Sequence, residues 1–326
     1  MLVSDFHLYS SNAILRGNLL DNIGKGGVGH GLVRQVQLVN PSIFIGFKYP
    51  QKQLMIGALM SEIIRDRDAE IELQNTLNRD GKVWVIGDVH GHADALENLI
   101  TEIDPNPGDR IVLLGDLIDR GPDARMVIRI ARERGDTFAL KGNHEDMALK
   151  GFEGDNLISW TPPLDWLFNG GKQCLDSYRN SDGELNQDDW VRDLVWMAAR
   201  PHMILLDEWI LVHAGIDPTE SLENQTAETL LWIRKKFHSA KKPLDSHRTV
   251  VFGHSITHRV LGQSIGDIGR SEFCLEDGRP LWIGIDTGAC DSTSGWLTAI
   301  DLNTGEIVQA NDTGDSRRPD LAFKRT

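Results

Sequence analysis

Cysteine is scarce in this chain: 3 of its 326 residues are cysteines, namely Cys174, Cys274 and Cys290. They are odd in number, far apart in the sequence, and form no Cys-x-x-Cys pair. This pattern argues against a disulfide scaffold and against a zinc site made of cysteines alone. Low cysteine usage is typical of a reducing compartment, so we expect a cytoplasmic protein.

Long apolar runs are also missing. The most apolar region, roughly residues 36–64, is interrupted by two prolines and two lysines. A membrane-spanning helix needs about 20 mostly apolar residues, and no such run is present here. The first residues lack a basic head followed by an apolar stretch, so we expect no secretory signal and no membrane partner.

Positive charge is in deficit. The 34 Lys and Arg residues face 48 Asp and Glu residues, which gives a formal net charge of −14. Because coating a nucleic acid requires clustered cations, we predict no nucleic-acid partner. A small phosphorylated substrate is still compatible with this charge, since a few local cations can outweigh the overall field.

After Gly81, short apolar runs ending in glycine alternate with amphipathic stretches. The runs predict strands over 83–88, 110–116, 137–143, 209–215, 249–255 and 281–289, with an extra strand within 202–208. The amphipathic stretches predict helices over 93–103, 122–135, 164–178 and 188–199. A turn signal at 303–305 predicts a hairpin over 296–310. This alternation favours an α/β sandwich with its loops gathered at the carboxyl ends of the strands.

Three segments follow from this division. Residues 82–302 form the predicted main domain, and 303–326 contain the last hairpin strand and a polar tail that we expect to fray. Residues 1–81 are an N-terminal extension that could be a dimerisation arm, a substrate-recruiting cap or a packed extension of the sandwich. Within it we expect a strand pair over 33–49 and a helix over 53–79. Its Gly-rich stretch at 24–31 lacks the Lys and Ser/Thr of a nucleotide-binding loop, which indicates a flexible loop.

Metal-ligating residue types recur at the predicted strand ends. They are Asp88, His90, Asp116, Asn143, His213 and His254. Oxygen and imidazole donors without a thiolate suit Mn²⁺, Fe or Zn²⁺. Six donors are too many for one catalytic ion that keeps an open position, but they are enough for two ions that share a bridging aspartate.

The strand-end motifs resemble a known family. GDVHG (87–91), GDLIDRG (115–121), GNHE (142–145), HAG (213–215) and FGH (252–254), in this order, resemble the phosphoprotein phosphatase family of metallophosphoesterases. WLFNGG (166–171), WIR (232–234) and IDTGA (285–289) are similar to its bacterial and phage lambda branch. The resemblance covers about 82–302. It implies a calcineurin-like β-sandwich flanked by helices in α/β/β/α layers, with a dinuclear metal site at one sheet edge.

The resemblance also implies a role for each donor. Asp88 and His90 would hold the first metal and Asp116 would bridge the two. The second metal would be held by the remaining donors, which are Asn143, His213 and His254.

The resemblance also implies a general acid and phosphate-binding residues beside the metals. His144 would be the general acid, oriented by Asp119, and we expect the carboxylate to raise the pKa of the imidazole and keep it protonated. Arg120, Arg234 and Asn143 would bind the phosphate oxygens. The remaining nearby residues are expected to support or pack the site, namely Glu145, Asp286, Cys290 and the tryptophans.

The resemblance implies a protein serine/threonine phosphatase. Its substrate would be a phosphorylated protein or peptide, with phosphotyrosine as a further target. A hydroxide bridging two divalent ions, Mn²⁺ first, would attack in line. The alternatives are a symmetrical diadenosine tetraphosphate hydrolase and a small-molecule phosphomonoesterase. The tetraphosphate hydrolases lack the aspartate of DRG and read GNHD, whereas this chain has Asp119 and Glu145, which favours the phosphatase. We further expect a homodimer contact within residues 1–81.

Overall fold

The structure, a computed structural model, describes residues 65–152, 160–243 and 245–323. The predicted Gly-rich loop at 24–31, the strand pair at 33–49 and the first part of the helix at 53–79 lie outside the described residues. Among the described residues, no helix is long and apolar enough to cross a membrane.

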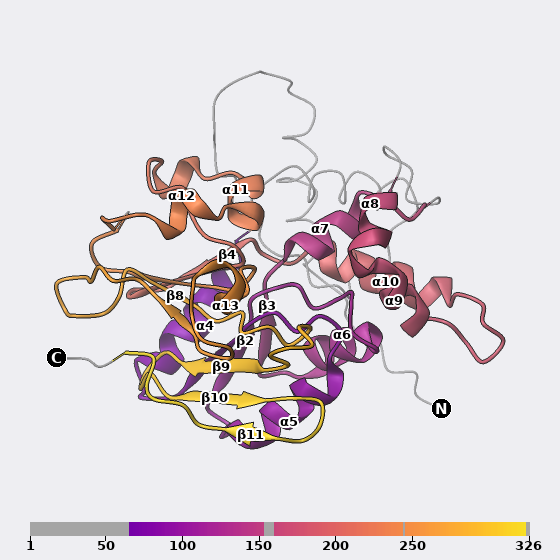
Figure 1. Cartoon of the computed structure of the whole chain (residues 1–326), viewed down its shortest axis with the longest axis horizontal. Coiled ribbons are helices and arrows are strands. Elements are labelled where there is room, and N and C mark those ends of the chain that lie inside the picture. The colour runs from indigo at the N-terminus through magenta and orange to yellow at the C-terminus, as the bar shows by residue number, and fades with distance from the viewer. Residues whose placement is uncertain (1–64, 153–159, 244, 324–326) are drawn as a thin grey trace, which may run out of the picture. The chain divides into compact units, whose positions relative to one another are not determined.

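The described chain forms two mixed sheets (Figure 1). The first has the strand order β11–β10–β9–β1–β2–β3, with β1, β2 and β3 parallel and β9 antiparallel to β1. Its strands are β1 (Val83–Ile86), β2 (Arg110–Leu113), β3 (Thr137–Ala139), β9 (Leu297–Asp301), β10 (Ile307–Ala310) and β11 (Ser316–Arg317).

The second sheet has the order β4–β5–β6–β8–β7, in which β5, β6 and β8 are parallel. Its strands are β4 (Met203–Leu205), β5 (Trp209–Val212), β6 (Thr249–Phe252), β7 (Gly269–Arg270) and β8 (Trp282–Gly284). The predicted strand positions are therefore confirmed, including the extra strand within 202–208. In both sheets the parallel strands carry the loops that contain the predicted ligands.

Side chains alternate between two hydrophobic clusters along each central strand. Val83 and Val85 of β1 lie in a cluster with residues of both sheets, such as Leu211 and Ile283. Trp84 and Ile86 belong to a second cluster shared with the helices beside the first sheet. Successive strand residues point to opposite faces, so a strand that is buried on both faces needs apolar residues at every position. This explains why the sequence shows apolar runs rather than alternation.

The helices cover the outer faces. Beside the first sheet lie α5 (Ala93–Ile103), α6 (Ala124–Glu133), α7 (Asn143–Leu149), α8 (Leu164–Trp166), α9 (Lys172–Ser177) and α10 (Gln187–Ala198). Beside the second lie α11 (Ala227–Trp232) and α12 (Lys235–His238), whose Leu230 and Phe237 are buried against it. Two further short helices are η3 (Leu222–Asn224) and α13 (Thr257–Val260). The predicted α/β/β/α layers are confirmed.

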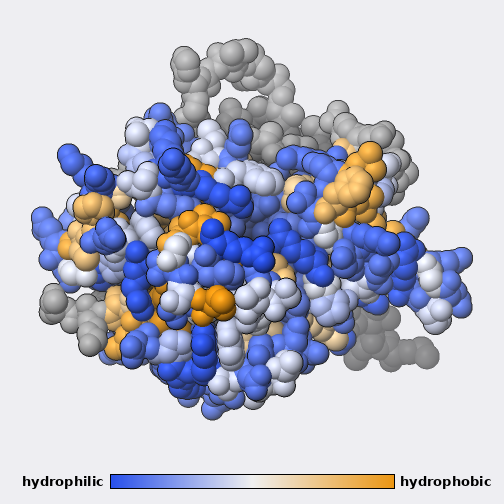
Figure 2. Space-filling model, in the orientation of Figure 1, coloured by the Kyte–Doolittle hydropathy of each residue, from blue (hydrophilic) through white to orange (hydrophobic). Residues whose placement is uncertain are grey.

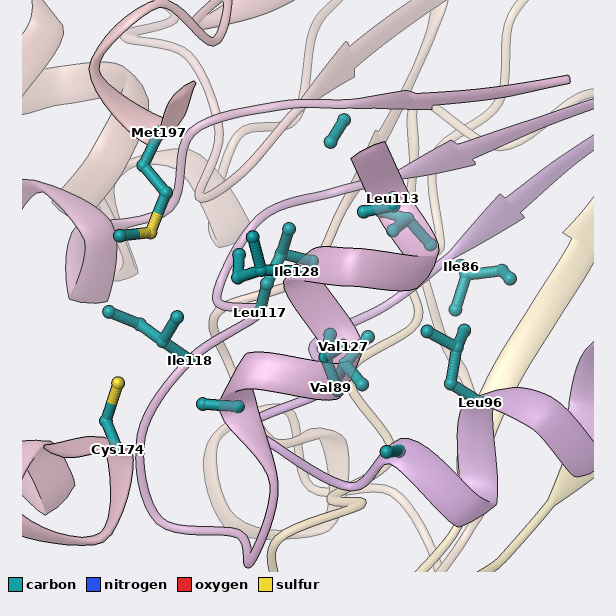
Figure 3. Close-up of a cluster of buried hydrophobic side chains, with 14 of the residues drawn as sticks. Ile86, Val89, Leu96, Leu113, Leu117, Ile118, Val127, Ile128, Cys174 and Met197 are labelled. Carbon is teal, nitrogen blue, oxygen red and sulfur yellow. The ribbon is translucent and has the colours of Figure 1, made fainter. Parts of the chain in front are cut away.

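Helix α6 shows how the sequence sets an element. The Asp123 side chain accepts a hydrogen bond from the Met126 N–H and so caps the first turn. Ala124, Val127, Ile128 and Ala131 recur at helical spacing and are all buried. Figure 3 shows Val127 and Ile128 in one cluster with Leu117 and Ile118. That cluster therefore anchors the loop after β2, which carries predicted site residues.

The predicted helix over 164–178 is interrupted. Helix α8 passes into a π-helical turn, η2 (Leu167–Gly171), before α9 begins. Gly170 has φ +113°, a conformation that ends regular helical geometry at this position. The sequence carries a breaker signal here, Asn-Gly-Gly at 169–171, which the prediction of one continuous helix passed over.

Both segments that flank the predicted main domain contribute described residues to the packed structure. Helix α4 (Arg67–Leu77) packs on the sandwich, with Leu73 fully buried between the sheets. At the other end, the expectation of a frayed tail is wrong for the described residues. The predicted hairpin over 296–310 is confirmed, because β10 pairs antiparallel with β9. Beyond the hairpin, the Phe323 side chain is buried against Trp209. Burial of a few apolar side chains overrides the polar composition of these segments.

Candidate active site and metal centre

The predicted ligands come together from both sheets. Asp88 follows β1, Asp116 follows β2 and Asn143 begins α7 directly after β3. From the second sheet, His213 follows β5 and His254 follows β6. All six predicted ligands, His90 included, are buried. Parallel strands bring their carboxyl ends to one edge, so the site forms where the edges of both sheets meet.

The backbone of these loops is held in an unfavourable conformation. His90, Asp116, Asp119, Arg120 and His254 all have φ between +48° and +74°. Left-handed backbone costs about 1–2 kcal/mol for a residue with a Cβ, and it persists only where surrounding packing enforces it. Five such residues at one edge of the sandwich mark this edge as the functional part of the described chain.

Two motif glycines are required by close approach. A Cβ on Gly142 would lie 2.2 Å from the Asp116 carboxylate, and one on Gly253 would lie 2.0 Å from Asp88 Oδ1. Both distances are far below any van der Waals contact. The glycines of GNHE and FGH therefore allow neighbouring loops to approach the two aspartates.

Asp116 lies at the centre of the site. Its Oδ2 is 3.6 Å from His90 Nε2 and 3.8 Å from His144 Nε2, and its Oδ1 is 3.4 Å from His213 Nε2. In the described part of the chain two groups have ligand atoms close enough for a metal ion: His90, Asp116 and His144, and Asp116, His213 and His254. Asp116 belongs to both groups, which is the arrangement that a bridging ligand requires.

Asn143 joins the second group. Its Oδ1 lies 2.8 Å from His213 Nε2 and 2.8 Å from His254 Nδ1, so one amide oxygen and two imidazole nitrogens converge. His254 also contacts Asp88, whose two carboxylate oxygens each accept the His254 backbone N–H at 3.0 Å. Asp88 therefore sits next to the second group, whereas the first group contains His144 in its place.

Burial controls the charges of these groups. Burial, followed by repulsion from neighbouring carboxylates, raises the pKa of Asp88 well above its ordinary value. It raises the pKa of Asp116 and of Asp286 to about 7. Burial also lowers the pKa of His213 to about 4, and it lowers the pKa of His90 and His254. Neutral imidazoles are ready to bind a metal, and the positive charge of Arg120 offsets only part of the effect of burial on the carboxylates.

Glu145 supports the loops without facing the cluster. Its buried carboxylate accepts N–H groups from Gly142 at 2.7 Å, Leu117 at 2.8 Å and Asp116 at 2.9 Å. Burial and the nearby Asp116 raise its pKa to about 7, and these N–H donors offset part of that rise. Glu145 therefore ties the loop after β2 to the start of α7.

A chain of contacts surrounds His144. Its Nδ1 lies 2.5 Å from Asp119 Oδ2, as predicted for a carboxylate that orients it. Its Nε2 lies 2.9 Å from Arg120 Nη2 and therefore accepts from the guanidinium. The expected rise in the pKa of His144 is wrong for this state: burial and then the Arg120 charge hold that pKa well below its usual value.

Both predicted phosphate-binding arginines reach the rim of the site. Arg120 Nη1 lies 2.6 Å from His90 Nε2 and 3.5 Å from Cys290 Sγ. Arg234 stands between α11 and α12, and its Nη2 lies 3.5 Å from the backbone oxygen of His254. Both residues have solvent-exposed surface, so each guanidinium can meet a ligand from solvent.

Trp166 is the main residue that sequence reasoning missed. Its indole N–H donates to Asp119 Oδ2 at 2.8 Å, the same oxygen that faces His144. The motif WLFNGG contained the signal, but a buried tryptophan is usually explained by packing alone.

The calcineurin-like phosphoesterase family matches residues 81–284, which is more than half of the chain. The chain belongs to the calcineurin-like phosphoesterase family. The match spans every strand that carries a predicted ligand.

The relatives of this chain include proteins of two kinds. The chain is 30% identical over 184 residues to serine/threonine-protein phosphatase 2 of Escherichia coli. This match covers 53% of this chain and 78% of that protein. It is 35% identical over 145 residues to the symmetrical bis(5'-nucleosyl)-tetraphosphatase of Klebsiella pneumoniae, covering 43% of this chain and 45% of that one. The chain thus spans less than half of the tetraphosphatase. The resemblance to the phosphoprotein phosphatases is confirmed at the level of family.

A solved protein serine/threonine phosphatase from Saccharomyces cerevisiae is also similar. Its TM-score is 0.48 at 14% identity, and the match covers 79% of this chain and 84% of that one.

Membership of this metallophosphoesterase family implies divalent metal ions, and the residues present fit them. The donors are carboxylates, an amide oxygen and neutral imidazoles, which are the ligands that such ions prefer. His254 Nε2 is buried and has no hydrogen-bond partner among the described residues. Bound cations would also compensate the buried carboxylates.

Proposed function

We propose that this calcineurin-like phosphoesterase is a metal-dependent phosphomonoesterase that acts on phosphoserine and phosphothreonine in proteins, with phosphotyrosine as a further target. The observation that carries the proposal is the His144–Asp119 contact of 2.5 Å at the edge of the ligand cluster. A monoester expels a poor alkoxide leaving group, which needs a proton from a positioned acid.

Six residues would hold two divalent ions, with Mn²⁺ as the expected activating metal. They are Asp88, His90, Asp116, Asn143, His213 and His254. The ions would activate a water for in-line attack and withdraw charge from the phosphate oxygens. Asp116 lies between the two groups and Glu145 fixes its backbone.

Arg120 connects phosphate binding to the acid. In the ligand-free site its guanidinium donates to His144 Nε2. A phosphate dianion would take over this guanidinium, because charge-assisted forks to phosphate are stronger than a bond to imidazole. His144 Nε2 is then free to carry a proton, and Asp119 stabilises the imidazolium. Arg234 would bind the phosphate from the opposite rim.

The second candidate is hydrolysis of diadenosine tetraphosphate, which the similarity to the Klebsiella tetraphosphatase favours. Cleaving an anhydride expels a good leaving group and needs an acid less. The two candidates therefore differ in how much they depend on His144 and Asp119.

A substrate panel tests the proposal. With Mn²⁺ present, kcat/KM is measured at matched concentrations for phosphoserine, phosphothreonine and phosphotyrosine peptides, for p-nitrophenyl phosphate and for diadenosine tetraphosphate. We expect the phosphoserine and phosphothreonine peptides to lead. A preference of orders of magnitude for the dinucleotide would overturn the proposal in favour of the second candidate.

The acid is tested by His144→Asn. We expect kcat to fall about 10²–10⁴-fold for alkyl phosphates and much less for p-nitrophenyl phosphate, whose phenolate leaves without a proton. Equal losses for both substrates would contradict the role of His144.

The remaining expectations are proposals of the same kind. They are a cytoplasmic location, a phosphorylated protein partner, no nucleic-acid or membrane partner, and a homodimer contact within residues 1–81.

A further inference from the structure

The segment that includes WLFNGG has one side in solvent and one side in the site. Leu164 and Phe168 are 72% and 89% exposed. Figure 2 shows an apolar patch in the region of α8. Trp166, between them in sequence, is fully buried. The segment therefore directs one large aromatic side chain inward.

The segment contacts the two residues that follow Ile118. Trp166 Nε1 donates to Asp119 Oδ2 at 2.8 Å. Four residues later, the Gly170 carbonyl accepts the backbone N–H of Arg120 at 3.2 Å. Regular helical geometry is broken at Gly170, which lies against the Arg120 backbone and Cγ.

We propose that Trp166 is a positioning residue for the phosphatase reaction: its indole N–H holds Asp119 Oδ2 toward His144. The inference rests on the proposed function, because it assigns Trp166 to the general-acid pair. Two ring nitrogens lie within hydrogen-bond distance of Asp119 Oδ2: His144 Nδ1 at 2.5 Å and Trp166 Nε1 at 2.8 Å. A fixed second donor restricts rotation of the carboxylate.

The aromatic surroundings give the indole a fixed orientation. Trp166 stacks on Trp190 with ring centroids 5.7 Å apart and an interplanar angle of 19°. Trp160 meets the edges of both rings, at 5.6 Å and 5.1 Å. This cluster of Trp160, Trp166 and Trp190 cannot turn one ring without displacing the others, so the N–H direction is preorganised.

Trp190 offers a matched control within the same cluster. It is as deeply buried as Trp166, but its Nε1 has no hydrogen-bond partner among the described residues. Trp166→Phe and Trp190→Phe therefore remove the same atoms from the same packing. Only Trp166→Phe removes a bond to the acid pair.

The experiment compares the two variants in the full chain with Mn²⁺. For Trp166→Phe we expect kcat on a phosphoserine peptide to fall about tenfold, with KM and the rate on p-nitrophenyl phosphate changed less than about threefold. Trp190→Phe should lose comparable thermal stability and keep the ratio of the two substrates. In an Asp119→Asn background, adding Trp166→Phe should have no further effect.

Three outcomes would overturn the inference. They are an equal change in the substrate ratio for both tryptophan variants, an equal loss on both substrates for Trp166→Phe, and an additive loss in the Asp119→Asn background. His144→Asn in the same assay tests the proposed function separately. The hydrogen bond itself is read by NMR: Asp119→Asn should shift the Trp166 indole N–H resonance and leave that of Trp190 in place, and an unchanged Trp166 resonance would also overturn the inference.

Discussion

Glu145 illustrates what one buried carboxylate does at the scale of a residue. It touches neither predicted phosphate-binding arginine, yet it accepts three short hydrogen bonds from the backbone of two loops. Those loops carry Asp116 and Asn143. A change at Glu145 should therefore act on the metal site through the backbone.

Glu145→Gln tests this connection. A glutamine has one carbonyl oxygen in place of two, so its amide group would face backbone N–H donors. We expect a loss of about 1–3 kcal/mol in the free energy of unfolding and weaker Mn²⁺ binding, measured by denaturant titration and calorimetry. Glu133→Gln is the control, because Glu133 is 54% exposed and pairs with Arg129 on the surface. Equal losses in the two variants would contradict the role of Glu145.

At the scale of the element, the interrupted helix α8–η2–α9 is set by one glycine. Gly170 has φ +113°, and a Cβ there would lie 2.7 Å from both the Arg120 backbone nitrogen and Cγ. Backbone conformation and lack of space both require glycine here. The break in the helix is thus linked to the position of Arg120.

Gly170→Ala should lower stability and displace Arg120. We expect the free energy of unfolding to fall by about 2–4 kcal/mol and KM for a phosphopeptide to rise. Gly183→Ala isolates the cost of the backbone conformation, since Gly183 has φ +80° but no atom within 4 Å of an added Cβ. It should cost about 1 kcal/mol and leave KM unchanged. A KM that stays constant in Gly170→Ala would argue against the link to Arg120.

The C-terminal strand is the second element with a testable consequence. Strand β10 pairs with β9, and its side chains are buried in both the helix-side and the inter-sheet clusters. Removing residues 303–326 should therefore expose β9 and abolish cooperative folding. Circular dichroism and thermal melting would show this, and a shortened chain with an unchanged melting temperature would contradict the packing described above.

At the scale of the whole molecule, buried charge couples folding to metal and pH. Burial raises the pKa of Asp116 and Asp286 to about 7, so the metal-free native state keeps protons that the unfolded chain has already released. Raising the pH through 7 then favours unfolding. Histidines whose pKa is lowered in the native state, such as His213, affect stability mainly below pH 6.5. There the unfolded chain binds protons that the native state does not, so falling pH destabilises the native state.

The metal-free protein should therefore lose about 1–2 kcal/mol of stability between pH 6.5 and 8. Added Mn²⁺ should raise the melting temperature more at pH 8 than at pH 6.5, because a bound cation favours the ionised carboxylates. Melting curves with and without a chelator at both pH values measure this. A metal effect that does not depend on pH would show that these carboxylates are not linked to the ion.

Local sequence patterns were enough to predict the parallel strands, the main helices and the candidate residues of the site. Apolar runs mark strands that are buried on both faces, and ligand types at successive strand ends need no knowledge of long-range contacts. The role of Trp166, the position of Arg120 against Gly170 and the packing of α4 and Phe323 depended on the tertiary structure. Each results from contacts between residues distant in the chain, such as Trp166 with Asp119, which local patterns do not encode. The lowered pKa of His144 has the same origin, because burial and the Arg120 guanidinium outweigh the adjacent carboxylate only in the folded site.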